Sequence, residues 1–222
     1  MMFLDLIYVK IKKKKKMESI SYISINVSFI IYCIYFLPQI IHNQLKCQLS
    51  HISNGTHILM VCANILDLIY GFGFKLQWQY RVVTILALAY LVFQQWQIYR
   101  NRSKKSSKFH LVILLIITAG IILVKLDILR SDQLEKIGFI SMFCYSIYWI
   151  PQIIKNIQER KATAFSVIFL LLNVLALVCD EISALIFNWP LPSVISPLLM
   201  LSLLLIMVGQ YYYYKRLRMS ID

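Results

Sequence analysis

Charged side chains are scarce in this sequence, and acidic ones are the scarcest. Charged residues make up 15% of its 222 positions, with 10 Asp and Glu against 23 Lys and Arg, whereas soluble domains are typically about a quarter charged. Apolar residues make up 59%, and the mean hydropathy is +0.69. This composition excludes an ordinary soluble domain and indicates an integral membrane protein. It also leaves no soluble basic domain that could bind nucleic acid.

Cysteine is also rare, and its spacing has no recognisable pattern. The five cysteines form no CxxC pair, which argues against a zinc site and against a disulfide framework. His42, His51 and His57 lie near Cys47, but their spacing fits no common zinc motif. The sequence has no HExxH motif and no glycine-rich phosphate loop. It therefore predicts neither an enzyme nor a metal site, and it implies no cofactor.

Long apolar runs are what the chain has instead. Each run is close to the roughly 20 residues that a helix needs to cross a bilayer, and none alternates as a barrel strand would. We therefore predict seven transmembrane helices, at about residues 20–42, 56–75, 79–99, 109–128, 136–157, 163–188 and 190–213.

The basic residues predict the orientation of these helices. Cytoplasmic loops are enriched in Lys and Arg, and with seven spans the basic segments 100–108, 155–161 and 215–218 fall on one side. The C-terminus is therefore predicted to be cytoplasmic, in a bacterial inner membrane or an organelle membrane. The lysines of residues 12–16 would lie on the opposite side, so we hypothesise that residues 1–16 are an upstream extension before Met17.

One short phrase occurs twice. "YFLPQIIHN" at 35–43 and "YWIPQIIKN" at 148–156 share six of nine residues and lie 113 positions apart. The following apolar runs also align, which matches Asn64 with Asn173, and the third spans end alike in "QWQIYR" and "QYYYYK". An unmatched helix between two groups of three restores the orientation of the second group, so the repeats run parallel.

The fold predicted from this pattern is an all-α membrane protein of seven helices in a 3+1+3 plan. Two parallel three-helix bundles are joined by one linker helix. The predicted parts are an N-terminal tail at 1–19, a first repeat at 20–105, the linker at 106–132, a second repeat at 133–216 and a C-terminal tail at 217–222.

The two Pro-Gln pairs, Pro38-Gln39 and Pro151-Gln152, resemble those of the PQ-loop family of membrane carriers. The resemblance covers roughly residues 20–216. The family includes cystinosin-like carriers, vacuolar cationic amino-acid carriers and, more distantly, the SWEET sugar carriers. The resemblance implies a carrier of small-molecule solutes that works by alternating access and holds its substrate between the repeats near mid-membrane.

The repeated prolines predict a hinge in the first helix of each repeat. A proline inside a helix removes one backbone donor and clashes with the preceding turn, so Pro38 and Pro151 should kink their helices. Gln39 and Gln152 can hydrogen-bond to the freed carbonyls or to a neighbouring helix. These four residues are the predicted gate.

Polar residues follow one face of the second helix in each repeat. Asn64, Asp67 and Gly71 have the spacing i, i+3 and i+7, and Asn173 and Asp180 have the spacing i and i+7. A carboxylate inside a span is costly and is functional by default. We predict that the two asparagines bind substrate and that Asp180, then Asp67, couples transport to protons. The competing interpretation is that the asparagines only join helices.

Two neighbouring residues are weighed against these candidates. Glu181 is turned by about 100° from Asp180 on a helix, so both cannot face one pocket. Trp149 lies beside Pro151 and is a predicted substrate-binding and gate residue. Three other tryptophans, Trp78, Trp96 and Trp189, lie at span ends, where an interfacial belt explains them.

The predicted function is transport of an amino acid or a related metabolite. One alternative is a non-transporting accessory protein or trafficking receptor, for which cationic residues inside the spans are expected, and only Lys125 approaches that. A second alternative is a sugar facilitator, but residues 56–75 and 163–188 lack the prolines that SWEET carriers have there. The predicted partners are a small solute, membrane lipid and protons. A homo-oligomer is also compatible with the sequence.

Overall fold

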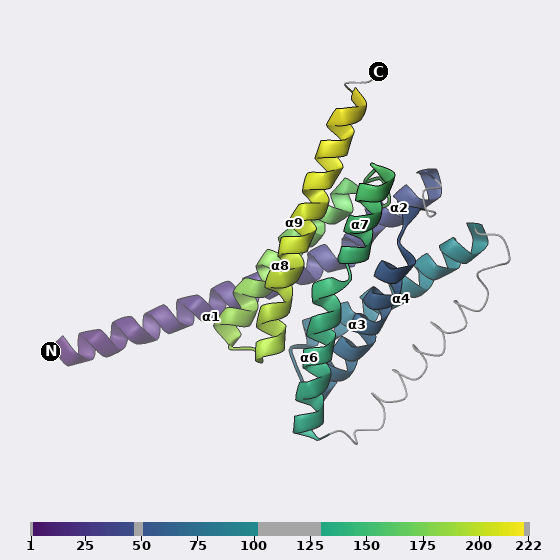
Figure 1. The fold of residues 1–222 in the computed structure, drawn as a ribbon. Helices are drawn as coiled ribbons and strands as arrows, with labels where there is room; N and C mark the ends of the chain where they lie inside the picture. The colour runs from purple at the N-terminus through teal and green to yellow at the C-terminus, as the bar shows by residue number, and fades with distance from the viewer. Residues whose placement is uncertain (1, 47–50, 102–129, 220–222) are drawn as a thin grey trace.

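The structure is a computed structural model that describes residues 2–46, 51–101 and 130–219. The regular structure of these residues is α-helical, without strands, as the length of the apolar runs and their lack of alternation predict (Figure 1). The helices are α1 (Met2–Ile34), α2 (Phe36–Lys46), α3 (Asn54–Gly73), α4 (Trp78–Asn101), α6 (Ser131–Ile147), α7 (Ile150–Glu159), α8 (Val167–Phe187) and α9 (Leu191–Met219).

Five helical stretches of the described chain are long and apolar enough to cross a membrane. They are Lys16–Leu45, Asn54–Gly73, Ser131–Glu159, Val167–Phe187 and Leu191–Leu217. They match five predicted spans. Helix α4 occupies the place of the predicted span 79–99 but is less apolar and is not among the five. The predicted linker span 109–128 lies outside the described residues, so the 3+1+3 plan stays a prediction.

The outer surface of the bundle carries large apolar side chains. Ile23, Phe143 and Leu185 are 64%, 61% and 58% exposed. A soluble monomer rarely exposes extended apolar surface, whereas a lipid-facing surface has no reason to be polar. Together with the five spanning stretches, this surface makes the chain a multi-pass membrane protein.

The first helix of each repeat is interrupted one turn before its proline. Helix α1 ends at Ile34 and α6 ends at Ile147. These residues lie four positions before Pro38 and Pro151, where a proline ring clashes with the carbonyl of the preceding turn. The chain then resumes as α2 and α7, so the regular helix is interrupted before each proline, and the kinks themselves stay a prediction.

The helices form two units, α1–α4 and α6–α9, in which each interrupted first helix counts as one. Corresponding helices of the two units make corresponding contacts. In the first unit α4 packs against both α1 and α3, and in the second α9 packs against both α6 and α8. Between the units, α1 packs along α8 and α3 packs along α6 (Figure 1). The first helix of each unit therefore lies on the second helix of the other unit.

A glycine allows one of these close packings. A Cβ added at Gly138 of α6 would lie 2.5 Å from the ring of Tyr70 in α3. Real Cβ atoms essentially never come so close to another atom, so the ring of Tyr70 occupies the space that a residue larger than glycine would need at position 138. This contact helps to set the distance between α3 and α6.

Candidate functional site

A cavity of about 130 Å³ lies between the two units. An engineered cavity of roughly 150 Å³ admits benzene, so this volume suits a solute of about six non-hydrogen atoms. The structure brings four predicted site residues together in its wall, namely Asn64, Asp67, Asn173 and Asp180. The cavity therefore collects the polar faces of α3 and α8, as the sequence pattern predicts.

Asp180 is held from the opposite unit. The hydroxyl of Tyr32, in α1, donates a hydrogen bond of 2.7 Å to Oδ2 of Asp180, in α8. Ser28 of α1 also interacts with the carboxylate. This contact joins the first helix of one unit to the second helix of the other across the cavity wall.

Asp67 receives hydroxyl donors from both units. Tyr80 of α4 donates to its Oδ1 at 2.5 Å, and Thr84 of α4 donates to its Oδ2 at 3.4 Å. Tyr145 of α6 lies beside the same carboxylate. Tyr145 is the repeat counterpart of Tyr32, 113 positions later, so each carboxylate meets a tyrosine from the first helix of the opposite unit.

The two carboxylates are nevertheless not repeat counterparts. The alignment that pairs Asn64 with Asn173 places Asp67 opposite Ala176 and Asp180 opposite Gly71. Each unit therefore carries its carboxylate one helical turn from the position used in the other. The cavity is asymmetric in charge although its helices repeat.

The two asparagines are buried in the cavity wall. Asn64 is 6% exposed and donates from Nδ2 to the carbonyl of Met60 at 2.8 Å. Asn173 is 4% exposed and lies beside Tyr148. Their side chains are thus placed where a solute in the cavity would touch them.

Trp149 is not brought to the cavity. Its side chain is fully buried and lies against Tyr148 and Phe165, with ring centroids 4.9 and 5.1 Å away. Glu181 does not line the cavity either, which agrees with its predicted direction away from Asp180. The indole packs in the core beside the α6–α7 break.

The Pro-Gln glutamines hold the opposite unit through paired hydrogen bonds, which we call the glutamine clips. Gln39 donates to the carbonyl of Ala164 at 3.1 Å and accepts from the backbone N–H of Ser166 at 2.7 Å. Gln152 donates to the carbonyl of His51 at 3.0 Å and accepts from the N–H of Ser53 at 2.8 Å. Ser53 and Ser166 directly precede α3 and α8.

Each clip is extended by an asparagine and a second glutamine. Gln39 donates to Asn43, which donates to Gln97 of α4 at 3.0 Å. Gln152 donates to Asn156, which donates to Gln210 of α9 at 2.9 Å. The third helices therefore align as Gln97 with Gln210, a register two residues away from the sequence comparison that started at Gln95 and Gln210.

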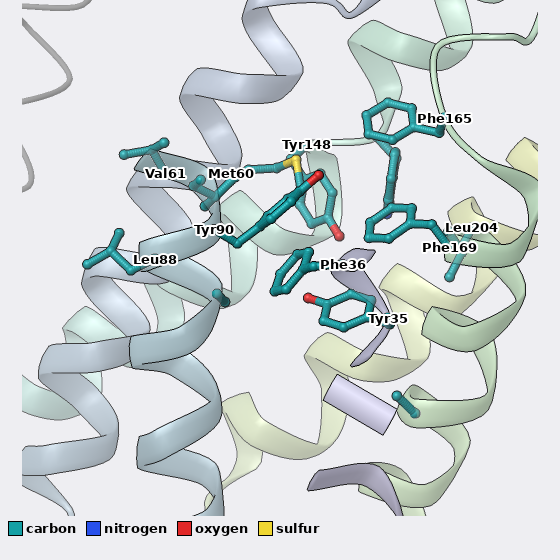
Figure 2. Packing of buried hydrophobic residues seen from close by; sticks show 14 of the residues in the cluster. Tyr35, Phe36, Met60, Val61, Leu88, Tyr90, Tyr148, Phe165, Phe169 and Leu204 are labelled. Carbon is teal, nitrogen blue, oxygen red and sulfur yellow. The ribbon is translucent and has the colours of Figure 1, made fainter. Parts of the chain in front are cut away.

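A group of rings, the aromatic layer, lies between the clips and the cavity. Phe36 stacks on Tyr90 with centroids 3.7 Å apart, and Tyr35 stacks on Phe169 with centroids 5.2 Å apart. Figure 2 shows these four rings and Tyr148 converging from several helices. Phe36 is one turn before Gln39 and Phe169 is one turn after Ser166. The cavity is thus bounded by rings on the side of the clips.

The sequence did not identify the tyrosines of the cavity. Tyr32 and Tyr145, and Tyr35 and Tyr148, line it from the two first helices. A tyrosine in an apolar run has no feature that separates it from an ordinary core or interfacial residue. The usable signal was the repeat itself, because both pairs recur at the 113-residue spacing of the Pro-Gln pairs.

No metal site is found in the described ranges. These residues contain no group of three His, Cys, Asp or Glu side chains that could hold a metal ion. The cavity instead offers carboxylates, amides, hydroxyls and aromatic rings, which suits a ligand bound by hydrogen bonds and charge.

Comparison with known proteins agrees with this architecture. The structure of a eukaryotic SWEET transporter superposes with a TM-score of 0.68 at 12% sequence identity, over 90% of this chain and 99% of that one. No curated protein matches the sequence. The family model described as PQ loop repeat matches residues 20–80 and 134–193, more than half of the chain. The chain therefore belongs to the PQ-loop repeat family.

Proposed function

We propose that this protein is a membrane carrier that moves a small solute by alternating access. The family and the fold support a transporter in general, and neither favours an enzyme. The proposal rests on the cavity, which lies between two units of the same helix arrangement. The aromatic layer and the glutamine clips bound this cavity on one side. Such a site can be opened on alternate sides if the units rock against each other.

The clips and the helix breaks supply the moving parts in this proposal. Release of both glutamines would free the first turns of α3 and α8 from the opposite unit. The breaks before Pro38 and Pro151 let α2 and α7 swing without unwinding α1 and α6. The described arrangement would then be the state that is closed on the side of the clips.

The solute and its coupling belong to the same proposal. A cavity of about 130 Å³ fits the expected amino acid or related metabolite. Asp180 and Asp67 face this cavity and are the candidates for carrying a proton across with it, or against it. Asn64 and Asn173 would hydrogen-bond to the solute between them.

A sugar is the second candidate solute, because the similar structure is that of a SWEET transporter. At 12% identity this likeness concerns the fold alone. The two carboxylates in the wall favour the first candidate, since a neutral sugar gives them no charge to pair with. The proposal of a sugar as solute therefore rests on the similarity of the fold and not on the residues of the cavity.

Exchange of labelled solute in liposomes tests the proposal. Purified protein is reconstituted and loaded with unlabelled amino acids, amines or glucose, and uptake of the same labelled compound is followed. A carrier exchanges at least one of these compounds, and exchange is lost when both Asn64 and Asn173 are replaced by leucine. Absence of exchange for every compound, with a folded protein, would contradict transport and favour the accessory-protein alternative.

A further inference from the structure

The described part of the cavity wall holds two carboxyl groups and no cationic side chain. Asp67 and Asp180 both line it and are near enough to interact electrostatically. Within the described residues no Lys, Arg or His lines the cavity. Arg81 follows Tyr80 in α4, but its guanidinium lies over the ring of Phe72, 5.3 Å from the centroid, and not in the cavity. Buried carboxylates without a counter-charge are costly, so the described part of the wall favours a ligand that brings a positive charge.

Two further polar groups in the wall make no hydrogen bond to any described residue. Asn64 uses Nδ2 to donate to the carbonyl of Met60, and that carbonyl can only accept. The remaining amide atom is therefore Oδ1, an acceptor, which receives no hydrogen bond from the described residues. Tyr35 is 7% exposed, and its hydroxyl likewise makes no hydrogen bond to a described residue. Buried polar groups are normally paired, so these two point to a ligand in the cavity.

The balance of unpaired groups specifies the ligand. Two carboxylates and the Asn64 oxygen accept, whereas the indole N–H of Trp189 is an unpaired donor in the same wall. The acceptors outnumber this donor, so a ligand with more N–H donors than acceptors is required. A solute carboxylate would meet repulsion and no cationic side chain. The first turns of α4 and α9 reach the cavity, but a helix N-terminus carries only about half a positive charge. A zwitterion therefore gains less in this cavity than a cation of the same size.

Aromatic rings complete the site. Tyr35, Phe36, Tyr148 and Phe169 line the end of the cavity at the aromatic layer, and Trp189 lines it near the start of α9. Ring faces attract organic cations, and they also accommodate a short alkyl chain. The cavity thus combines acceptors for an ammonium group with apolar surface for its carbon chain.

We propose that the solute is a small organic amine in its protonated form, of about six non-hydrogen atoms and without a carboxylate. The ammonium group binds among Asp180, Asp67 and the Asn64 oxygen, and the carbon chain lies against the rings. This inference rests on the proposed carrier function and narrows its substrate class. It separates the protein from carriers of zwitterionic amino acids and from carriers of sugars.

Three compounds of the same length isolate the charge. They are 4-amino-1-butanol, a cation; 4-aminobutanoate, a zwitterion; and 1,4-butanediol, which is neutral. Binding to the full-length protein in detergent is measured by calorimetry at one ionic strength. The amino alcohol should bind at least about tenfold more tightly than the other two, since its ammonium group alone makes charge-assisted hydrogen bonds without bringing a carboxylate. Equal binding of the diol or the zwitterion would overturn the proposal.

Variants assign the binding to the cavity. Asp180→Asn and Asp67→Asn should each weaken amino-alcohol binding by about tenfold or more. Glu181→Gln is the matched control, because it removes a neighbouring carboxylate that does not line the cavity. Asn64→Leu, which leaves both carboxylates and their hydroxyl partners in place, covers the case in which an aspartate variant fails to fold. Equal loss in the control, or no loss in any folded variant, would overturn the site.

Failure of the amine proposal can be distinguished from failure of the carrier proposal. If liposomes exchange glucose or a neutral amino acid while the amino alcohol does not bind, the carrier stands and the amine proposal fails. If the amino alcohol binds with the expected dependence on the aspartates but no solute is exchanged, the site stands and the carrier proposal fails.

Discussion

At the scale of residues, the cavity depends on hydroxyl groups placed against carboxylates. Tyr32 and Tyr80 each donate to an aspartate in the second helix of a unit. These bonds satisfy Asp180 and Asp67 in part and leave oxygen positions for a cation or a proton. In the proposed mechanism the same two carboxylates bind the solute and carry the proton, in competition.

Proton coupling predicts a specific effect of neutral replacements. Asparagine has nearly the volume of aspartate but cannot ionise, so Asp180→Asn or Asp67→Asn should abolish uptake driven by a pH gradient. Exchange at equal pH should continue with weaker affinity. The measurement is uptake into liposomes with and without an imposed gradient, with Glu181→Gln as control. If both variants retain full accumulation, the carboxylates do not carry the proton.

The glutamine clips give a second prediction at this scale. Gln39→Ala removes the partners of the Ser166 N–H and the Ala164 carbonyl, and a buried group left unpaired costs about 1–3 kcal/mol. The variant should lower the thermal midpoint in detergent and open the side of the clips. Gln152→Ala should act alike, because its bonds are the counterparts in the other unit. Gln158→Ala, at an exposed glutamine of the same helix as Gln152, should have little effect. An unchanged thermal midpoint in both clip variants would contradict a role of the clips in holding the gate closed.

At the scale of elements, the interrupted first helices are the proposed hinges. Replacement of Pro38 or Pro151 by alanine restores the backbone donor and removes the clash with the preceding turn. The protein should still insert, but conversion between states should slow. Pro190→Ala is the control, since Pro190 lies between α8 and α9 and not within a helix. Solute exchange rates measure the effect, and wild-type rates in both variants would make the two prolines structural only.

The packing of α3 on α6 predicts a contrast between two glycines. Gly138→Ala places a methyl group against the ring of Tyr70 and should lower thermal stability, whereas Gly209 has nothing within 4 Å of an added Cβ. Gly209→Ala should be neutral or stabilising by up to about 1 kcal/mol, from helix propensity. Thermal unfolding in detergent compares the two. Equal effects would contradict the close approach at Gly138.

At the scale of the whole molecule, the repeat could be predicted from the sequence. Which helices of the two repeats pack against each other could not. Six apolar runs and the positions of Asn64, Asn173, Asp67 and Asp180 follow from hydropathy and helical spacing. The crossing of α1 onto α8 and of α3 onto α6 does not, because no local pattern says which helices meet. Trp149 illustrates the same limit. Its proximity to Pro151 in sequence suggested a site residue, whereas packing decides that it faces Phe165.

The central claim is that one cavity is reached from each side of the membrane in turn. Met60 lines this cavity, so Met60→Cys, in protein lacking the other cysteines, reports access. Sealed vesicles are treated with a membrane-impermeant thiol reagent on one side or the other. Single cysteines at Leu191 and Arg216, both exposed and near opposite ends of α9, establish sidedness.

Alternating access predicts that Met60→Cys is labelled from both sides, and that bound amino alcohol slows labelling from each. It also predicts that Gln39→Ala raises the rate from the side of the clips, where Arg216 lies with the C-terminal end of α9, and lowers it from the other side. Labelling from one side alone, unchanged by substrate and by loss of the clip, would contradict alternating access and leave a cavity that opens to a single compartment.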